Sequence, residues 1–178
     1  TAIQNTLIGG LAGDALTTGS FNTALGYGAL SLDDLGSQNV AIGYNALTAQ
    51  NFATATTSLN TAVGSSAGAN VSTGVQNTFI GAGSGDGTDD GDNNTAVGYL
   101  ALSANCGDAN TAVGQFALSV CTGANNTALG TDAGAALTSG SNNLLLGHDA
   151  GRTGSPGGNL TTQSNEIVLG DENITACN

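Results

Sequence analysis

A five-residue box that recurs ten times along the chain constrains its fold more than any other feature. The form Asn-Thr-Ala-Val-Gly stands at residues 60–64, 94–98 and 110–114, and variants of it stand at 5–9, 22–26, 39–43, 77–81, 126–130, 143–147 and 166–170. The box glycines are 16 or 17 residues apart in seven of the nine intervals, and 21 and 23 residues apart in the other two. A fixed period of this length predicts a stack of identical structural units.

Within each box the side chains follow the two-residue alternation of a short strand. The residue before the glycine is always a branched aliphatic, as in Ile42, Val97 and Leu129. We expect this face to fill the inside of a coil. The middle residue of the box is mostly alanine, as in Ala62 and Ala112, and we expect that face to meet another copy of the chain.

A second regularity follows each box. The third residue after the glycine is alanine in eight copies, and the next residue is always leucine or glycine, as in Leu102 and Gly134. This pattern predicts a second short strand or a tight corner that also points inward. Polar segments rich in Gly, Ser and Asn complete each coil as turns.

These patterns together predict an all-β fold, a parallel β-solenoid of about ten coils of roughly 17 residues. Frequent glycine and a spacing of two between apolar residues argue against helices. We expect one solenoid domain over residues 1–178, with regular coils over 1–151, an inserted loop over 152–164 that holds the single proline, and a terminal strand over 165–178. Ten coils would form a rod about 45 Å long.

The asparagine that opens most boxes has a structural interpretation. Side-chain amides that stack on like residues in neighbouring strands can bond to one another along the stack. We therefore expect a structural ladder, without a catalytic role, formed by Asn22, Asn39, Asn60, Asn77, Asn94, Asn110, Asn126 and Asn143.

Charge and composition exclude several classes of function. The chain carries 13 acidic residues against one basic residue, a net charge of −12. Without a basic patch we expect no nucleic-acid partner. No apolar run approaches the 18 residues of a membrane span, so we expect no membrane insertion either. Three cysteines form no disulfide framework; Cys106 and Cys121 fall on adjacent coils, where they are either a bridge or, as we favour, two buried thiols.

Two groups of residues are candidate ligand sites. Asp86, Asp89, Asp90 and Asp92 crowd into one glycine-rich segment and are a weak calcium candidate, since calcium prefers several oxygen ligands; the spacing fits no known calcium loop, and the alternative is a solvated acidic turn. We expect no other cofactor. Tyr27, Tyr44 and Tyr99 directly follow box glycines and could stack on the sugars of a receptor, although packing at a corner is the simpler interpretation.

The longer repeats Asn22-Thr-Ala-Leu-Gly-Tyr-Gly-Ala-Leu30 and Asn94-Thr-Ala-Val-Gly-Tyr-Leu-Ala-Leu102 resemble those of bacteriophage tail fibres. In that family the repeats precede a self-cleaving C-terminal chaperone domain, and residues 165–175 are similar to the strand that leads into it. The box is also similar to head repeats of trimeric autotransporter adhesins, which are shorter and lack the Ala-Leu ending.

Both resemblances imply a homotrimer outside the cell, on a virion tail fibre or a cell surface. The expected function is that of a structural and adhesive fibre segment whose partners are itself and a surface glycan or protein receptor. One alternative is a subunit of an extracellular filament that stacks head to tail. Another is a polysaccharide-depolymerising tailspike, which would need paired carboxylates. Neither family's motif carries a catalytic residue, so we expect the chain not to be an enzyme.

Overall fold

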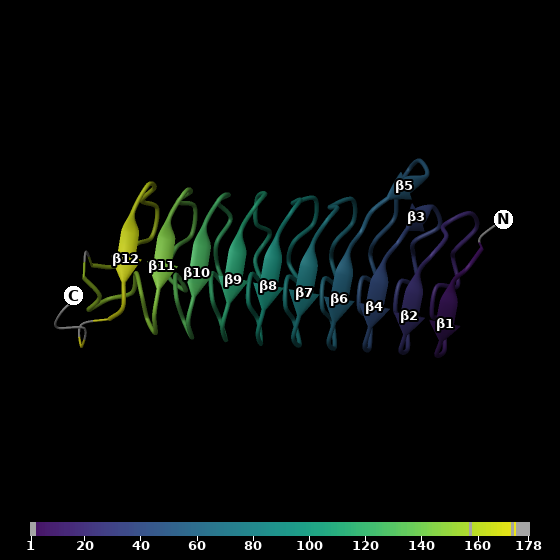
Figure 1. Ribbon diagram of the computed structural model, residues 1–178, viewed down its shortest axis with the longest axis horizontal. Helices are drawn as coiled ribbons and strands as arrows, with labels where there is room; N and C mark the ends of the chain where they lie inside the picture. The colour runs from purple at the N-terminus through teal and green to yellow at the C-terminus, as the bar shows by residue number, and fades with distance from the viewer. Residues whose placement is uncertain (1–2, 157, 172, 174–178) are drawn as a thin grey trace.

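The chain winds into a rod whose turns lie side by side in sequence order (Figure 1). The structure is a computed structural model that describes residues 3–156, 158–171 and 173. Ten strands form one parallel sheet in the order β1-β2-β4-β6-β7-β8-β9-β10-β11-β12, and β3 and β5 form a second, two-stranded sheet. The strands are β1 Thr6–Ile8, β2 Thr23–Leu25, β3 Gly36–Ser37, β4 Val40–Ile42, β5 Thr56–Thr57, β6 Thr61–Val63, β7 Thr78–Ile80, β8 Thr95–Val97, β9 Thr111–Val113, β10 Thr127–Leu129, β11 Leu144–Leu146 and β12 Ile167–Leu169.

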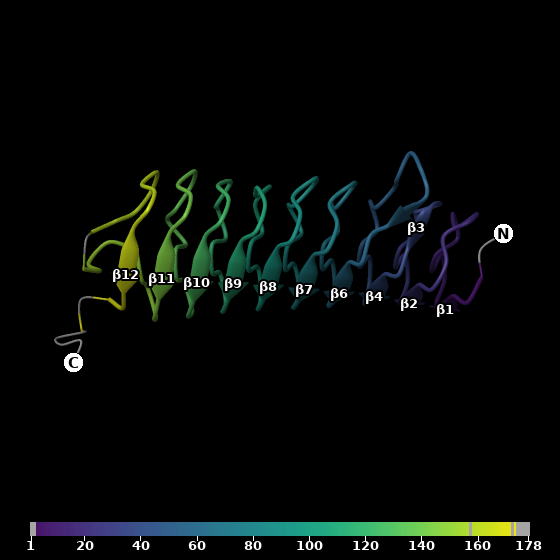
Figure 2. The same ribbon diagram turned by 45° about the horizontal axis from the view of Figure 1, so that its top comes forward.

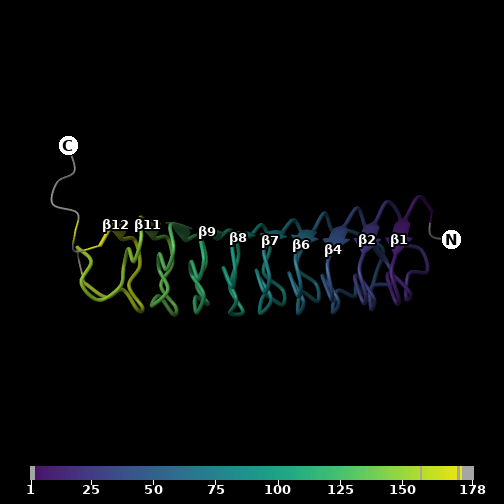
Figure 3. The same ribbon diagram turned by 90° about the horizontal axis from the view of Figure 1, so that it is seen from below.

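This architecture confirms the parallel β-solenoid. Equivalent box positions pair in every step, as in Thr95 with Thr111 and Val97 with Val113. The sheet occupies one long side of the rod, and the turns occupy the other (Figure 3). In the described part of the chain no helix is present, and so none that could cross a membrane.

The expected number of ten coils is too high. The steps from β1 to β11 make eight regular turns. The step from β11 to β12 passes instead through the segment 152–164, whose described residues form consecutive tight turns before Leu160 returns to the core. Of the terminal strand expected over 165–178, β12 accounts for Ile167–Leu169, and residues 172 and 174–178 lie outside the described residues.

The other long interval, between the third and fourth boxes, also has a structural outlet. It forms β5, which pairs with β3 of the preceding turn and rises from the rod as a protrusion (Figures 1 and 2). Phe52 within this insertion is buried and anchors it. Both insertions therefore leave the register of the main sheet unchanged.

The inward face of the strands is opposite to the one expected from the sequence. The middle residues of the boxes point inside, and Ala24, Ala62, Ala96 and Ala112 have no exposed surface. The aliphatic residues before the box glycines point outward instead: Ile8 is 58% exposed and Leu129 53%, while Val97 and Val113 are half-buried. The interior is too narrow for a large side chain from the strand as well as one from the corner opposite.

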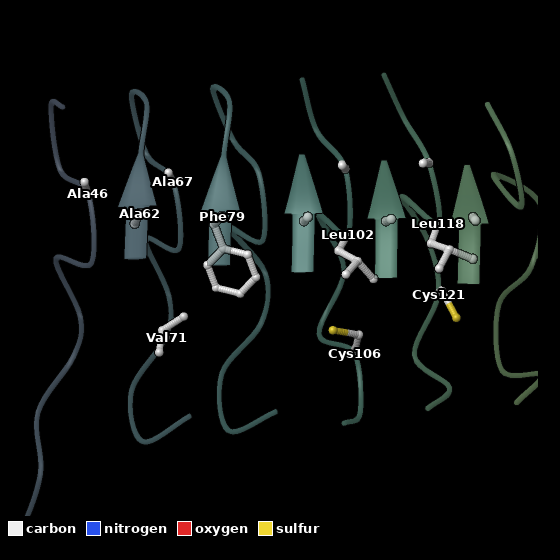
Figure 4. Close-up of a cluster of buried hydrophobic side chains, with 14 of the residues drawn as sticks. Ala46, Ala62, Ala67, Val71, Phe79, Leu102, Cys106, Leu118 and Cys121 are labelled. Atoms are coloured by element: carbon white, nitrogen blue, oxygen red, sulfur yellow. The ribbon is translucent and has the colours of Figure 1, made fainter. Parts of the chain in front are cut away.

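That narrow interior is filled by about one large side chain per turn (Figure 4). Where the strand contributes alanine, the corner often contributes leucine, as in Ala96 with Leu102. Where the strand contributes Phe79, the corner residue is Gly85, and a Cβ there would collide with the Phe79 ring. The choice between Leu and Gly at the corner thus matches the size of the strand residue.

Candidate functional site

The asparagine side chains join each turn to the next. In each, Oδ1 accepts a bond from the backbone N–H of the asparagine one turn later, as from Asn126 N to Asn110 Oδ1 at 2.9 Å. The amide nitrogen usually donates to a backbone carbonyl of the same next turn, as from Asn126 Nδ2 to Gly140 O at 2.9 Å. Two of these buried amide nitrogens, those of Asn39 and Asn94, have no partner among the described residues. These bonds run along the rod parallel to the sheet.

We expect the variant Asn126→Ala to be destabilised by about 2–5 kcal/mol, because it leaves two buried backbone groups, Asn143 N–H and Gly140 C=O, without partners. Urea unfolding followed by circular dichroism measures this loss. A loss below about 0.5 kcal/mol, the range of ordinary surface substitutions, would show that the ladder adds nothing to stability.

The acidic segment serves bonds between turns. Asp92 Oδ1 accepts from the backbone N–H of Val75 at 2.8 Å, and the Asp89 carboxylate accepts from the Ser72 hydroxyl. Asp90 is exposed, and one oxygen of Asp86 is buried without a partner, so burial raises the pKa of Asp86. The four carboxylates do not gather into a group with the spacing of cation ligands; among the described residues only one other group does.

That group lies near the C-terminal end of the rod and includes the only Arg and the only His of the chain. One ligand atom each from Asp132, His148 and Asp149 lies within 4.8 Å of the others. Arg152 Nη1 lies 2.8 Å from Asp149 Oδ1 and 3.3 Å from Asp132 Oδ1, so its guanidinium already neutralises both carboxylates. The arrangement ties two turns together by ion pairs.

His148 extends this cluster to a third turn. Its Nδ1 lies 3.4 Å from Asp149 Oδ2 and 3.5 Å from Asp171 Oδ2. The pKa of Asp171 lies below its usual range, chiefly because the backbone and side chain of Asn173 donate to its carboxylate. The cluster is a surface feature, since the His148 side chain is 62% exposed.

The tyrosines use their ring faces against their neighbours. Tyr27 and Tyr44 stack across adjacent turns with ring centroids 5.9 Å apart and planes 12° apart. Tyr99 makes an edge-to-face contact with Phe116 at 5.5 Å. Because the faces of Tyr27 and Tyr44 are turned toward one another, a sugar ring would find mainly their edges and hydroxyls.

A buried polar network under the β3–β5 insertion was not expected from the sequence. Gln50 Nε2 donates to Asp33 Oδ2 at 2.7 Å, and Asn60 Nδ2 donates to Gln50 Oε1 at the same distance. Asp33 Oδ1 accepts from the backbone N–H of Gly36. All three side chains are fully buried, and burial raises the pKa of Asp33. The network replaces, over two turns, the apolar filling found elsewhere.

Cys106 and Cys121 are buried free thiols on adjacent turns, and their sulfurs point in different directions (Figure 4). Burial raises the pKa of the Cys121 thiol from its ordinary value of 9.0 to about 11, and that of Cys106 above 9.0. Cys177 lies outside the described residues.

In a Cys177→Ser background we expect neither buried thiol of the folded chain to react with iodoacetamide at pH 8, because the thiolate is the nucleophile and both thiols stay protonated. Labelling should reach two groups per chain only after unfolding. Mass spectrometry of the labelled protein measures this, and rapid labelling of the native chain would contradict the buried assignment.

A shallow groove of about 410 Å³ runs along the outer face of the last strands. Its walls include Thr127, Leu144 and Ile167 of β10, β11 and β12, flanked by Asn125 and Asn142. It is half open to solvent, unlike the enclosed pockets that hold small molecules.

No protein-family model matches this chain, and neither the curated proteins nor the solved structures compared with it include a match.

Proposed function

We propose that this chain is a rigid structural segment of an extracellular attachment fibre, of the kind found in phage tail fibres and cell-surface adhesins, and that it works as a homotrimer. The observation that supports this proposal best is the continuity of bonding from turn to turn. Each turn is joined to the next along the strands, along the corners and through the asparagine ladder.

These three lines of bonds give the rod its mechanical character. The corner bonds repeat as regularly as the strand pairs, as from Leu118 N to Ala133 O and from Leu102 N to Ala117 O, both 3.0 Å. To bend the rod, bonds on one side would have to lengthen while the closely packed interior resists compression. A stiff spacer that holds an attachment site away from its base is what such a structure suits.

The proposed partners are other copies of the chain and a surface receptor, either glycan or protein. The net charge of −12 opposes binding to nucleic acid, and the proposal includes no membrane insertion, no enzymatic activity and no required cofactor. Tyr27, Tyr44 and Tyr99 remain receptor candidates through their hydroxyls and ring edges.

Electron microscopy of the purified chain tests the shape and the discreteness of the proposed particle. We expect straight rods of uniform length, about 43 Å for ten strands at a spacing of about 4.8 Å. Long filaments would favour the head-to-tail subunit instead. Release of reducing sugar from a surface polysaccharide, lost on replacing one carboxylate, would favour the depolymerising tailspike.

A further inference from the structure

We propose that the outer face of the ten-stranded sheet is the surface through which copies of this chain pack against one another; this inference rests on the proposed homotrimeric fibre. The face consists of two columns of side chains, the first and third residues of each strand. The first column is Thr6, Thr23, Val40, Thr61, Thr78, Thr95, Thr111, Thr127, Leu144 and Ile167; the second is Ile8, Leu25, Ile42, Val63, Ile80, Val97, Val113, Leu129, Leu146 and Leu169.

The composition of this sheet face is unlike that of a solvated sheet. Its second column is aliphatic in all ten strands, and Ile8, Leu129 and Ile167 are 58%, 53% and 70% exposed in the single chain. An antiparallel or parallel sheet that faces water usually carries polar residues on that side. Contiguous exposed apolar surface of this kind marks an interaction site.

The size of the sheet face fits a protein interface. Ten strands at about 4.8 Å and three residues of strand at about 3.3 Å give an area of about 400 Å². The side chains of Tyr27, Tyr44 and Tyr99, directly beyond the box glycines and each about half exposed, widen the surface. The total approaches the roughly 800 Å² per partner of a stable interface.

Charge identifies another copy as the occupant. None of the twenty residues in the two columns is charged, although the chain as a whole carries a net charge of −12. Two copies with this charge repel one another unless they meet through a neutral face. The acidic residues instead lie in turns, as Asp89 and Asp92 do, or beyond the box glycines, as Asp132 and Asp149 do.

The spacing of the columns points the same way. A partner that contacts this sheet face along its whole length must present side chains with the same repeat, and a second copy of the chain does so by construction. The groove beside Thr127, Leu144 and Ile167 hollows this same sheet face, where a ridge of side chains from another copy can enter. Three such faces turned to a common axis form a closed assembly.

The double variant Val97→Glu with Val113→Glu tests this inference. Both valines are half-buried in the single chain and belong to adjacent strands β8 and β9, so glutamates there reach water in the separated chain but meet one another in the assembly. We expect light scattering to show that the particle mass falls from three chains to one, while circular dichroism keeps the β signal of the wild type.

The matched control is Ser139→Glu with Thr153→Glu, which adds the same charge at exposed residues outside the two columns. We expect it to keep the wild-type mass. If the valine variant also stays trimeric, the sheet face is not the interface, but the fibre proposal stands. If the valine variant loses its β signal, the milder Val97→Thr with Val113→Thr is compared, and an unchanged association constant overturns the inference. A wild-type particle of one chain overturns both the inference and the homotrimer.

Discussion

Replacing one box glycine by alanine, as in Gly98→Ala, is expected to destabilise the rod by about 3–5 kcal/mol. Gly98 has φ +137°, a conformation that side chains rarely adopt and that costs about 1–3 kcal/mol. A Cβ at this position would also lie 2.5 Å from the carbonyl oxygen of Gly114 in the next turn. That oxygen is part of a stacked backbone and cannot move without disturbing the turn beyond it, which adds an overpacking cost of about 1–3 kcal/mol.

The unfolding temperature of this variant should fall by about 8–15 °C for a chain of this size. The matched control is Gly10→Ala. Gly10 does not have a left-handed φ, and the nearest atom to its Cβ would be Tyr27 Cδ2 at 3.3 Å, on an exposed ring that can shift. Scanning calorimetry of the two variants should separate them clearly; equal unfolding temperatures would contradict the close backbone approach.

The second large effect is expected for Ala112→Asp. Ala112 has no exposed surface and stacks between Ala96 and Ala128 inside the rod, near Leu118. A carboxylate there would be buried without a partner, and an uncompensated buried charge costs about 3–5 kcal/mol. This is a large share of the 5–15 kcal/mol that stabilises an ordinary domain. We expect the variant to lose most of its β signal at neutral pH.

Val113→Asp is the matched control, since it places the same group one residue later on the outward face. We expect this control to keep its β signal although its chains separate. Circular dichroism of the two variants therefore tests which side of β9 points inward. A folded Ala112→Asp beside an unfolded Val113→Asp would reverse the register described here.

The periodicity predicted most of the fold because it is a property of the backbone stack. Equal intervals between Gly81, Gly98, Gly114 and Gly130 put equivalent residues one above another, and the strand pairs follow from this. The coil interior was predicted wrongly because size was taken as the sign of burial. Large aliphatics such as Val113 point outward, since the space inside is already taken by corner residues such as Leu118.

A signal for this interior was present in the sequence as a correlation between two positions. Phe79 and Leu145 in the strands are followed six residues later by Gly85 and Gly151, whereas Ala96 and Ala112 are followed by leucine. This is the pattern of two side chains that share one volume. It identifies the middle box residue as internal.

The candidate sites were less predictable because they depend on which turns stack. The ion pairs of His148 and Arg152 join residues from different turns, so adjacency in the sequence did not reveal Asp132 or Asp171 as partners. Asp33 and Gln50 carried a readable signal. They stand seven residues after a box glycine, where Leu16, Val71 and Leu137 stand in other turns. Polar residues at an apolar position of the repeat indicate a buried network.

The mass of the purified particle in solution tests the account most directly, because the proposed function and the proposed interface both depend on self-assembly. Light scattering coupled to size-exclusion chromatography should give three chains of 17.1 kDa per particle, with no change on dilution within the range of the measurement. A particle of one chain, folded and soluble with its aliphatic column exposed, would contradict the account.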